Sequence, residues 1–377
     1  MWIAALQLHG YRNYDQLVTD LLPGLNLLFG ENGQGKTNLV EAIYFLATGS
    51  SHRSSTNQNL IKNDLGTATI SLTAKNESRE LVVAAELNRD SANRFYVNGS
   101  PKKRLSDVVG LVRAVIFAPE DLDLIRRDPA DRRKFLDDAL VMLKPRLQGV
   151  RQDYDRVLKQ RNALLKSARF VSKPDLTTLD IWDEQLVKLG TEIITARLEL
   201  ISALEPTVNK FYQELSASKD PLSLRLESSI TGNDESHSVL EFSQSEQISR
   251  MFHDKLQTLR AQELERGVSL VGPHRDELQI TKAGLPARTQ SSQGEAWSMA
   301  LGLKLALGEL VREMTSTDPV LLLDDVFSVL DVGRRNRLIS FVANYEQVVI
   351  TSADRQTAPD LEWAKEIEIS QGAIVGA

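Results

Sequence analysis

The chain has 377 residues, of which 42% are hydrophobic and 25% charged, values typical of a globular protein with a packed core. At roughly 150 residues per domain, this length allows two or three domains, or one large domain with an insertion. The absence of cysteine excludes disulfides, thiolate zinc sites, iron–sulfur clusters and cysteine nucleophiles. The formal net charge of −6, taken alone, argues against nucleic acid as a partner.

No stretch of the sequence is suited to a membrane. None reaches the roughly 18 to 20 consecutive apolar residues that a membrane span needs. The first nine residues lack the basic region and the long apolar region of a secretory signal. We therefore expect a cytoplasmic protein with no membrane partner.

The first third of the chain predicts α/β structure rich in strands. Residues 2–8 alternate as in a strand, residues 25–29 predict a second strand, and the apolar spacing over 38–47 predicts a helix. Asn98-Gly99 predicts a hairpin turn, because both residues tolerate positive φ. Further strands are expected at 67–74, 81–87, 94–97 and 115–117.

The middle of the chain is predicted to be helical. Over residues 136–164 apolar side chains recur at alternating steps of four and three, a heptad seam that Arg161 interrupts. Pro145 and Gly149 predict a break within it. The pattern resumes over 186–203, so we expect an antiparallel helical hairpin, although amphipathic helices packed on a core would show the same pattern.

The last part returns to alternating strands and helices, which suggests an α/β unit interrupted by a helical insertion. The expected domains are an N-terminal lobe (1–125), an inserted helical arm (126–264) and a C-terminal lobe (265–377). The expected elements are strands at 222–230, 268–281, 320–323, 347–351 and 366–370, and helices at 238–264, 294–313 and 333–344.

One glycine-rich loop carries a complete phosphate-binding motif. The residues that match G-x-x-x-x-G-K-[ST], between a predicted strand and a predicted helix, are Gly30, Glu31, Asn32, Gly33, Gln34, Gly35, Lys36 and Thr37. The glycines let the loop curl so that backbone N–H groups point at a phosphate, and the helix N-terminus adds a positive dipole end. We expect Lys36 to reach the β- and γ-phosphates of ATP during catalysis, and Thr37 to hold Mg²⁺.

Two carboxylates follow a second apolar strand. The run Val320–Leu323 predicts a buried strand, and Asp324 and Asp325 stand at its carboxyl end, where α/β sheets bind ligands. We expect Asp324 to face Mg²⁺, usually through water, and Asp325 to polarise the attacking water. An apolar run followed by Asp is common by itself, and the phosphate loop makes this interpretation specific.

A third motif precedes the helix expected at 294–313. Ser292, with Glu295 three residues on, is placed as the N-cap of a capping box. Ser-x-Gly-Glu also resembles the signature motif of the ABC ATPase superfamily, in which the serine and the helix N-terminus face a γ-phosphate held by another subunit. Ser292 and Gly294 would then contact nucleotide, and both interpretations can hold together. Residues 328–331 resemble the S-x-L-D D-loop of that superfamily.

The spacing of these motifs selects a branch of the superfamily. Ser292 lies 256 residues after Lys36, and the gap holds the predicted helical arm. Transporter ATPases have the same motifs much closer together. A split head of this kind resembles the SMC and RecF group of DNA-maintenance ATPases, although the chain is too short for a full SMC arm.

Several local blocks resemble the RecF family in particular, over residues 8 to about 352. They are Tyr11-Arg12-Asn13-Tyr14, the segment 49–53, Phe117–Leu122, Arg132–Asp137 and Leu270–Asp276. The resemblance implies an α/β fold, with an ABC-type P-loop ATPase head in two lobes and an inserted α-helical arm, and a nucleotide contact by Arg12. Thr351 stands where transporters carry a switch histidine, and no Q-loop glutamine is recognisable.

The same resemblance implies a biological role. It implies slow, Mg²⁺-dependent and DNA-stimulated ATP hydrolysis by an ATP-dependent homodimer, in which each nucleotide meets Lys36 of one head and Ser292 of the other. It also implies binding to single- and double-stranded DNA at gapped junctions, loading of RecA with RecO and RecR in replication and recombinational repair, and SOS induction.

The charge is unevenly distributed, so the net value of −6 does not exclude DNA. Residues 101–170 carry 17 Lys and Arg against 10 Asp and Glu, a net charge of +7, which leaves −13 for the rest. A solvated helix face with i,i+4 ion pairs would show the same pattern. The candidates for contact with the phosphate backbone are Lys102, Lys103, Arg104, Arg132, Arg133 and Lys134.

Three alternatives remain at this point. The first is the cytosolic ATPase of an ABC transporter, which the 256-residue gap and the missing switch histidine disfavour. The second is an ATPase of the overcoming-lysogenisation-defect type, which usually carries a Toprim domain for which the residues after Thr351 leave little room. The third is a DNA-binding scaffold with a vestigial site, against which the intact Lys36, Thr37, Asp324 and Asp325 argue.

Overall fold

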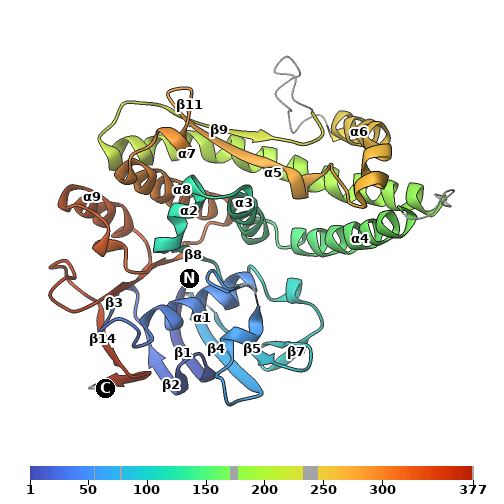
Figure 1. Ribbon diagram of the computed structural model, residues 1–377. Coiled ribbons are helices and arrows are strands. Elements are labelled where there is room, and N and C mark those ends of the chain that lie inside the picture. Colours follow the sequence, from blue (N-terminus) through green and yellow to red (C-terminus); the bar gives the residue numbers. More distant parts are fainter. Residues whose placement is uncertain (55, 77–78, 170–176, 232–244, 376–377) are drawn as a thin grey trace. The chain divides into compact units, whose positions relative to one another are not determined.

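The computed structural model describes residues 1–54, 56–76, 79–169, 177–231 and 245–375, and Figure 1 shows the order of its elements. The chain divides into two compact units, which we call the head and the arm. The head consists of Met1–Ile125, Thr207–Asp220 and Ser291–Ala377, and the arm of Arg126–Pro206 and Pro221–Gln290.

The head contains two six-stranded sheets, which confirms the predicted α/β class. The first sheet is antiparallel, in the order β2-β1-β4-β5-β6-β7, and the second is mainly parallel, in the order β15-β14-β3-β13-β12-β8. The first sheet comprises β1 (Trp2–Tyr11), β2 (Tyr14–Asp20), β4 (Thr67–Lys75), β5 (Glu80–Asn88), β6 (Arg94–Val97) and β7 (Ser100–Lys102). The second comprises β3 (Gly24–Phe29), β8 (Ala114–Phe117), β12 (Val320–Leu323), β13 (Gln347–Ser352), β14 (Lys365–Ser370) and β15 (Ala373–Val375).

In the described part of the chain, the longer helices that lie wholly in the head are α1 (Lys36–Thr48), α8 (Gln293–Thr315) and α9 (Val332–Val342). Helix α1 follows the glycine-rich loop and is capped at its C-terminus by Gly49. Gly49 adopts a left-handed conformation, and its backbone N–H donates to the carbonyl oxygen of Phe45. The short helices of the head are η1 (Asn57–Leu60), η2 (Leu105–Asp107), η3 (Pro119–Leu122) and η5 (Val326–Ser328), and α2 (Asp123–Arg126) ends at the first residue of the arm.

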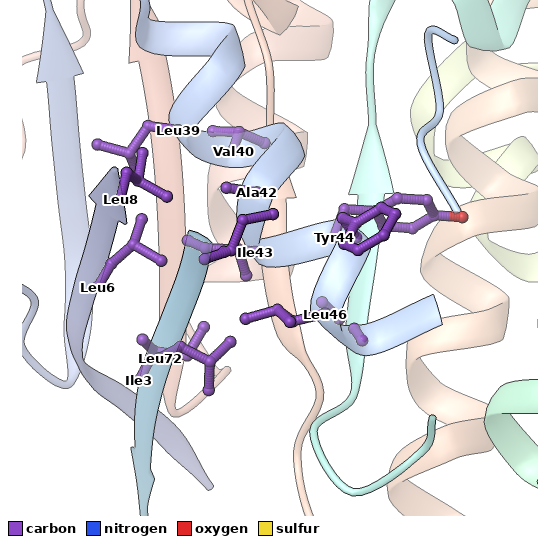
Figure 2. Packing of buried hydrophobic residues seen from close by; sticks show 14 of the residues in the cluster. Ile3, Leu6, Leu8, Leu39, Val40, Ala42, Ile43, Tyr44, Leu46 and Leu72 are labelled. Atoms are coloured by element: carbon purple, nitrogen blue, oxygen red, sulfur yellow. The ribbon is translucent and has the colours of Figure 1, made fainter. Parts of the chain in front are cut away.

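The hydrophobic core of the head fixes the position of α1. Figure 2 shows Leu39 and Ile43 of α1 turned toward Leu6 and Leu8 of β1 and toward Leu72 of β4, and all five side chains are buried. Truncation of a buried leucine to alanine costs about 2–5 kcal/mol. The first turn of α1, where the phosphate motif lies, is therefore firmly anchored to the antiparallel sheet.

The arm is mainly helical, with a small sheet in the order β11-β10-β9. The expected break lies between helix α3 (Pro129–Leu143) and helix α4 (Leu147–Ala168). Lys144, just before α4, pairs with Glu199 of α5 (Thr177–Ser216), and Arg161, near the end of α4, pairs with Asp183, near the start of α5. Helix α5 therefore runs antiparallel to α4. The elements of the arm are α3 (Pro129–Leu143), α4 (Leu147–Ala168), α5 (Thr177–Ser216, whose last residues belong to the head), β9 (Leu222–Glu227), α6 (Ser245–Arg266), η4 (Pro273–Arg275), β10 (Glu277–Lys282), β11 (Leu285–Pro286) and α7 (Ala287–Gln290).

Three expectations about the arm need correction. Residues 207–220, expected in the arm, belong to the head. The boundary expected after residue 264 lies instead after Gln290, because β10 pairs with β9 and so belongs to the arm. The strand expected at 268–281 begins only at Glu277, because Gly272 adopts φ 128° and starts the turn η4. Of the helix expected at 238–264, residues 238–244 lie outside the described part of the chain.

The turn at Gly272 carries a partly buried histidine. His274 hydrogen bonds with the hydroxyl of Tyr154 over 2.7 Å, and burial lowers its pKa to about 4. The imidazole is therefore neutral at pH 7, as suits a side chain that joins α4 to this turn.

Candidate phosphate-binding site

The glycine-rich loop connects β3 to α1 and has the backbone that its sequence predicts. Gly30, Gly33 and Gly35 adopt φ of 143°, 81° and 123°, values that residues with a side chain rarely adopt. A Cβ atom at Gly30 would lie 2.1 Å from the carbonyl oxygen of Ile369 on β14. Glycine is thus required both by the dihedral angle and by the neighbouring strand. The first backbone N–H groups of α1 have no partner within the helix and can face an anion.

Lys36 begins α1 and reaches back across the loop. Its Nζ donates to the carbonyl oxygens of Gly30 and Glu31, at 2.8 Å for the latter. Burial lowers the pKa of Lys36, and the charges of Asp325 and Asp324 oppose that shift. The ammonium group therefore lies at the loop, within the electrostatic influence of both predicted carboxylates.

A chain of hydroxyl groups connects the loop to the second motif. Asp324 follows β12 and is 3% exposed, and its Oδ1 accepts hydrogen bonds from Thr37 at 3.0 Å and from Thr351 at 2.7 Å. Thr351 lies on β13, the strand between β3 and β12, and its hydroxyl also accepts from the backbone N–H of Asp325 at 2.8 Å. The structure thus brings together Thr37 and Asp324, and it adds Thr351 to the site.

Burial raises the pKa of Asp324, and the hydrogen bonds from Thr351 and Thr37 partly offset this rise. The charge of Glu120 acts in the same direction as burial and that of Arg53 acts against it. Glu120 belongs to the segment after β8, whose end pairs with the end of β12. The segment that contains Glu120 stands roughly where ABC ATPases carry the Q-loop, whose glutamine could not be recognised in the sequence.

Asp325 is held in an unusual conformation. Its φ of 49° is left-handed, a region that Asp and Asn tolerate better than most residues, and it precedes the short helix η5. The backbone hydrogen bond to Thr351 fixes it beside Asp324. Asp325 is therefore anchored at the carboxyl end of β12, the edge where Asp324 meets the phosphate loop.

Arg12 is fixed by a buried glutamate of α1. Its guanidinium donates to both carboxylate oxygens of Glu41, at 2.8 and 2.6 Å, and to the carbonyl of Asn59 at 2.9 Å. Ser51 and Tyr11 also donate to Glu41, and Arg12 holds the pKa of this carboxyl below its usual range against the effect of burial. Sequence reasoning missed Glu41, because a glutamate in a helix gives no sign of burial.

A polar cavity of about 390 Å³ lies beside the loop. Asn13 lines it and also donates from Nδ2 to the carbonyl of Gln34, which places the cavity next to the phosphate motif. The other lining residues are Arg12, Asn38, Arg53, Asn59, Ile61, Lys62, Asn63 and Asp64.

The predicted capping box is present at the start of α8. Ser292 Oγ accepts from the backbone N–H of Glu295 at 3.3 Å, and Glu295 accepts from the backbone N–H of Ser292 at 2.8 Å. Ser292 is exposed, and a Cβ atom at Gly294 would lie 2.9 Å from the guanidinium of Arg334 on α9. The serine therefore caps the helix and still faces solvent.

The three basic candidates of the arm, Arg132, Arg133 and Lys134, differ in exposure. Arg132 is 5% exposed and forms a bidentate ion pair with Glu277. The expectation that Arg132 contacts the phosphate backbone of DNA is therefore corrected: this side chain has a structural role. Arg133 donates to the carbonyl of Asp276, whereas Lys134 is exposed and pairs with Asp138. In the head, Lys103 and Arg104 are exposed and Lys102 is partly so.

Among the described residues, no group of three or more His, Cys, Asp or Glu side chains could hold a metal ion by itself. The hydroxyl of Thr37 and the carboxylate of Asp324 are oxygen ligands of the kind that Mg²⁺ prefers, and Mg²⁺ usually keeps waters and substrate phosphates as its other ligands. The pair therefore fits Mg²⁺ that arrives with a nucleotide. In the part of the chain that the structure covers, every helix is too short or too polar to span a membrane.

Comparison with known proteins finds similarity over the whole chain. Residues 2–374 match the family described as RecF/RecN/SMC N terminal domain. The chain is 45% identical to the DNA replication and repair protein RecF of Clavibacter sepedonicus, over 100% of this chain and 95% of that protein. It is 43% identical to that of Streptomyces avermitilis, over 99% of each. A solved structure of the recombination mediator protein RecF-ATP in RecFOR pathway is 29% identical, covers 99% of this chain and 96% of its own, and has a TM-score of 0.89.

Proposed function

This chain belongs to the RecF family of the RecF/RecN/SMC group, and we propose that it is a DNA-binding ATPase that acts on single-strand gaps in replication and recombinational repair. The observation that carries the proposal is the hydrogen bond between Thr37 of the phosphate loop and Asp324 after β12. It joins a phosphate cradle to a metal-binding carboxylate, the two parts that ATP hydrolysis requires. The full-length similarity also disfavours a transporter subunit and a Toprim-linked ATPase.

The residues of the head divide the work of hydrolysis. The loop N–H groups and Lys36 hold the β- and γ-phosphates. Mg²⁺, when bound through Thr37 and Asp324, supplies charge neutralisation at the phosphates. Asp325 polarises the attacking water and accepts its proton. The water oxygen bonds to the γ-phosphorus as the bond to the β,γ-bridging oxygen breaks, giving ADP and phosphate, and the proton then passes from Asp325 to solvent.

The polar cavity beside the loop supplies a place for the nucleoside. Its asparagines offer donors and acceptors for a ribose and a base. Arg12 is presented there by Glu41, so a nucleotide contact by Arg12 costs little further ordering of its side chain.

The composite site requires a second copy of the chain. Ser292 is exposed at the N-terminus of α8, where backbone N–H groups favour an anion. We place Ser292 and Gly294 of one head against the γ-phosphate held by Lys36 of another, which makes the dimer depend on ATP. Hydrolysis removes those contacts and opens the dimer.

DNA is bound locally rather than by the whole acidic surface. Of the six basic candidates, Lys103, Arg104 and Lys134 are exposed and Lys102 is partly exposed. Contacts of such side chains with the phosphates of DNA weaken as salt rises. We further propose stimulation of hydrolysis by gapped DNA and cooperation with RecO and RecR in loading RecA, which agrees with the RecFOR pathway named for the similar structure.

Light scattering with and without ATP and a gapped duplex tests this function. The wild-type chain is expected to be a monomer alone and a dimer with ATP, and to bind the gapped duplex more tightly as the dimer. Lys36→Arg, which keeps the charge but misplaces it, is expected to remain monomeric. A wild-type chain that neither dimerises with ATP nor depends on ATP for DNA binding would contradict the proposal.

Thr351→Val is expected to shift the pH dependence of hydrolysis. The substitution keeps the shape but removes the hydroxyl that donates to Asp324, so the pKa of Asp324, already raised by burial, rises further. Only the ionised carboxylate binds Mg²⁺, and as pH falls it is protonated at a higher pH in the variant. The acid limb of a pH–rate profile should move upward relative to wild type. Thr258→Val, on an exposed face of α6, should leave it in place, and an unmoved limb in Thr351→Val would remove Thr351 from the site.

A further inference from the structure

Gln34, in the middle of the phosphate loop, is held from two sides. Its carbonyl oxygen accepts from Asn13 Nδ2 at 2.9 Å and from the backbone N–H of Gly372 at 3.0 Å. Its side-chain Oε1 accepts from the backbone N–H of Gln371 at 2.5 Å. The donors come from the β1–β2 turn and from the β14–β15 hairpin, which are both remote in sequence from the loop.

The β14–β15 hairpin meets the loop through a tight turn that requires glycine at its second position, Gly372. Gln371 and Gly372 adopt φ of 47° and 73°, the pattern of a two-residue hairpin turn between the paired residues Ser370 and Ala373. A Cβ atom at Gly372 would lie 2.6 Å from the carbonyl oxygen of Asn13, a backbone atom that cannot easily move away. The close packing of this turn against Asn13 is what brings its N–H groups to Gln34.

We propose that Asn13, Gln371 and Gly372 form a brace that holds the phosphate loop in its binding conformation through Gln34. These are positioning residues, and the inference rests on the proposed function of the loop in binding ATP. Gln34 stands between Gly33 and Gly35, which give the loop little stiffness of its own. Fixing the backbone of a flexible residue costs conformational entropy. A brace that fixes Gln34 before ATP arrives removes this cost from binding.

The chain contains a matched control for the brace. Asn98 and Gly99 form the turn between β6 and β7 with φ of 50° and 75°, almost the same as Gln371 and Gly372. Among the described residues, leaving aside Gly99 and its two chain neighbours, no atom lies within 4 Å of a Cβ built at Gly99. Alanine at either glycine therefore meets the same left-handed strain, and only alanine at Gly372 pushes the turn away from Asn13 and Gln34.

Equilibrium binding of ATP and of ADP, both with Mg²⁺, to Gly372→Ala and Gly99→Ala tests the proposal. We expect the Kd of both nucleotides to rise about tenfold in Gly372→Ala, which corresponds to about 1.4 kcal/mol, and to remain at the wild-type value in Gly99→Ala. The fall in Tm should be similar in the two variants. Since the brace acts on binding, the KM for ATP should rise more than kcat falls.

Gln34→Ala provides a second variant that keeps the backbone and the hairpin intact. It removes only the Oε1 acceptor, so we expect a smaller rise in Kd, about threefold, with an unchanged Tm. Both substitutions weaken the hydrogen bonds between Gln34 and the β14–β15 hairpin, so their effects should combine to less than their product. Equal Kd values for Gly372→Ala and Gly99→Ala, with a Kd for Gln34→Ala like that of wild type, would overturn the brace. Failure of the wild-type chain to bind ATP would instead overturn the proposed function.

Discussion

Asp325→Asn should bind ATP with wild-type affinity and hydrolyse it about 10²- to 10⁴-fold more slowly, the range expected when a general base is removed. Asparagine tolerates the left-handed φ of 49° as aspartate does, so the backbone hydrogen bond to Thr351 is retained. The amide cannot accept a proton from water. ATP therefore persists in the site, and the ATP-dependent dimer accumulates.

Phosphate release under single-turnover conditions, together with the size of the complex, measures both effects. Asp360→Asn makes the same change of charge at an exposed position of the head and should behave like the wild type. An unchanged rate in Asp325→Asn would remove Asp325 from the catalytic role, and a loss of ATP binding would make it a ligand-holding residue instead.

Arg161→Met should destabilise the arm by about 3–5 kcal/mol, although it repairs the heptad pattern of α4. Arg161 is fully buried and pairs with Asp183 and with Glu263, at 2.6 Å in each case, and it donates to Ser269 at 2.7 Å. Methionine fills a similar volume but leaves the buried carboxylates without this partner. Removing one member of a buried ion pair destabilises a protein far more than replacing the whole pair by apolar residues.

Urea-induced unfolding, followed by helical circular dichroism and by hydrogen exchange in α4 and α5, measures this loss. Arg156→Met is the matched control, because Arg156 lies on the same helix with a side chain 72% exposed, and its change should stay within about 0.5 kcal/mol. Equal midpoints for the two variants would show that the buried network adds nothing to the stability of the arm.

The phosphate loop could be predicted from the sequence because its requirements are local. Glycines supply the positive φ, and the lysine and threonine follow within the same turn of chain. The strand with Asp324 could be predicted for a similar reason, since four apolar residues ending in a carboxylate form one short element. The capping box at Ser292 is also complete within four residues.

Thr351, Glu41 and Gln371 could not be assigned in this way, because their roles arise from contacts between distant parts of the chain. Thr351 meets Asp324 only because β13 lies between β3 and β12 in the sheet. The basic run at Arg132 misled for the same reason: its partner, Glu277, is 145 residues away. A sequence shows the charge of a side chain, but its neighbours in the fold decide whether that charge is available to DNA.

Mixing two inactive variants tests the composite site most directly. A Lys36→Ala chain cannot bind nucleotide in its own phosphate loop, but its Ser292 can still contact a nucleotide held by a second head. A Ser292→Arg chain binds nucleotide, but the bulky arginine blocks the N-terminus of its helix α8 from contacting the nucleotide of the second head. A mixed dimer contains one intact site, built from Lys36 of one chain and Ser292 of the other. Steady-state ATP hydrolysis should therefore appear when the two variants are combined, at up to about half the wild-type rate per mixed dimer, as expected for one functional site of two. A mixture as inactive as its components would contradict a site shared between two heads.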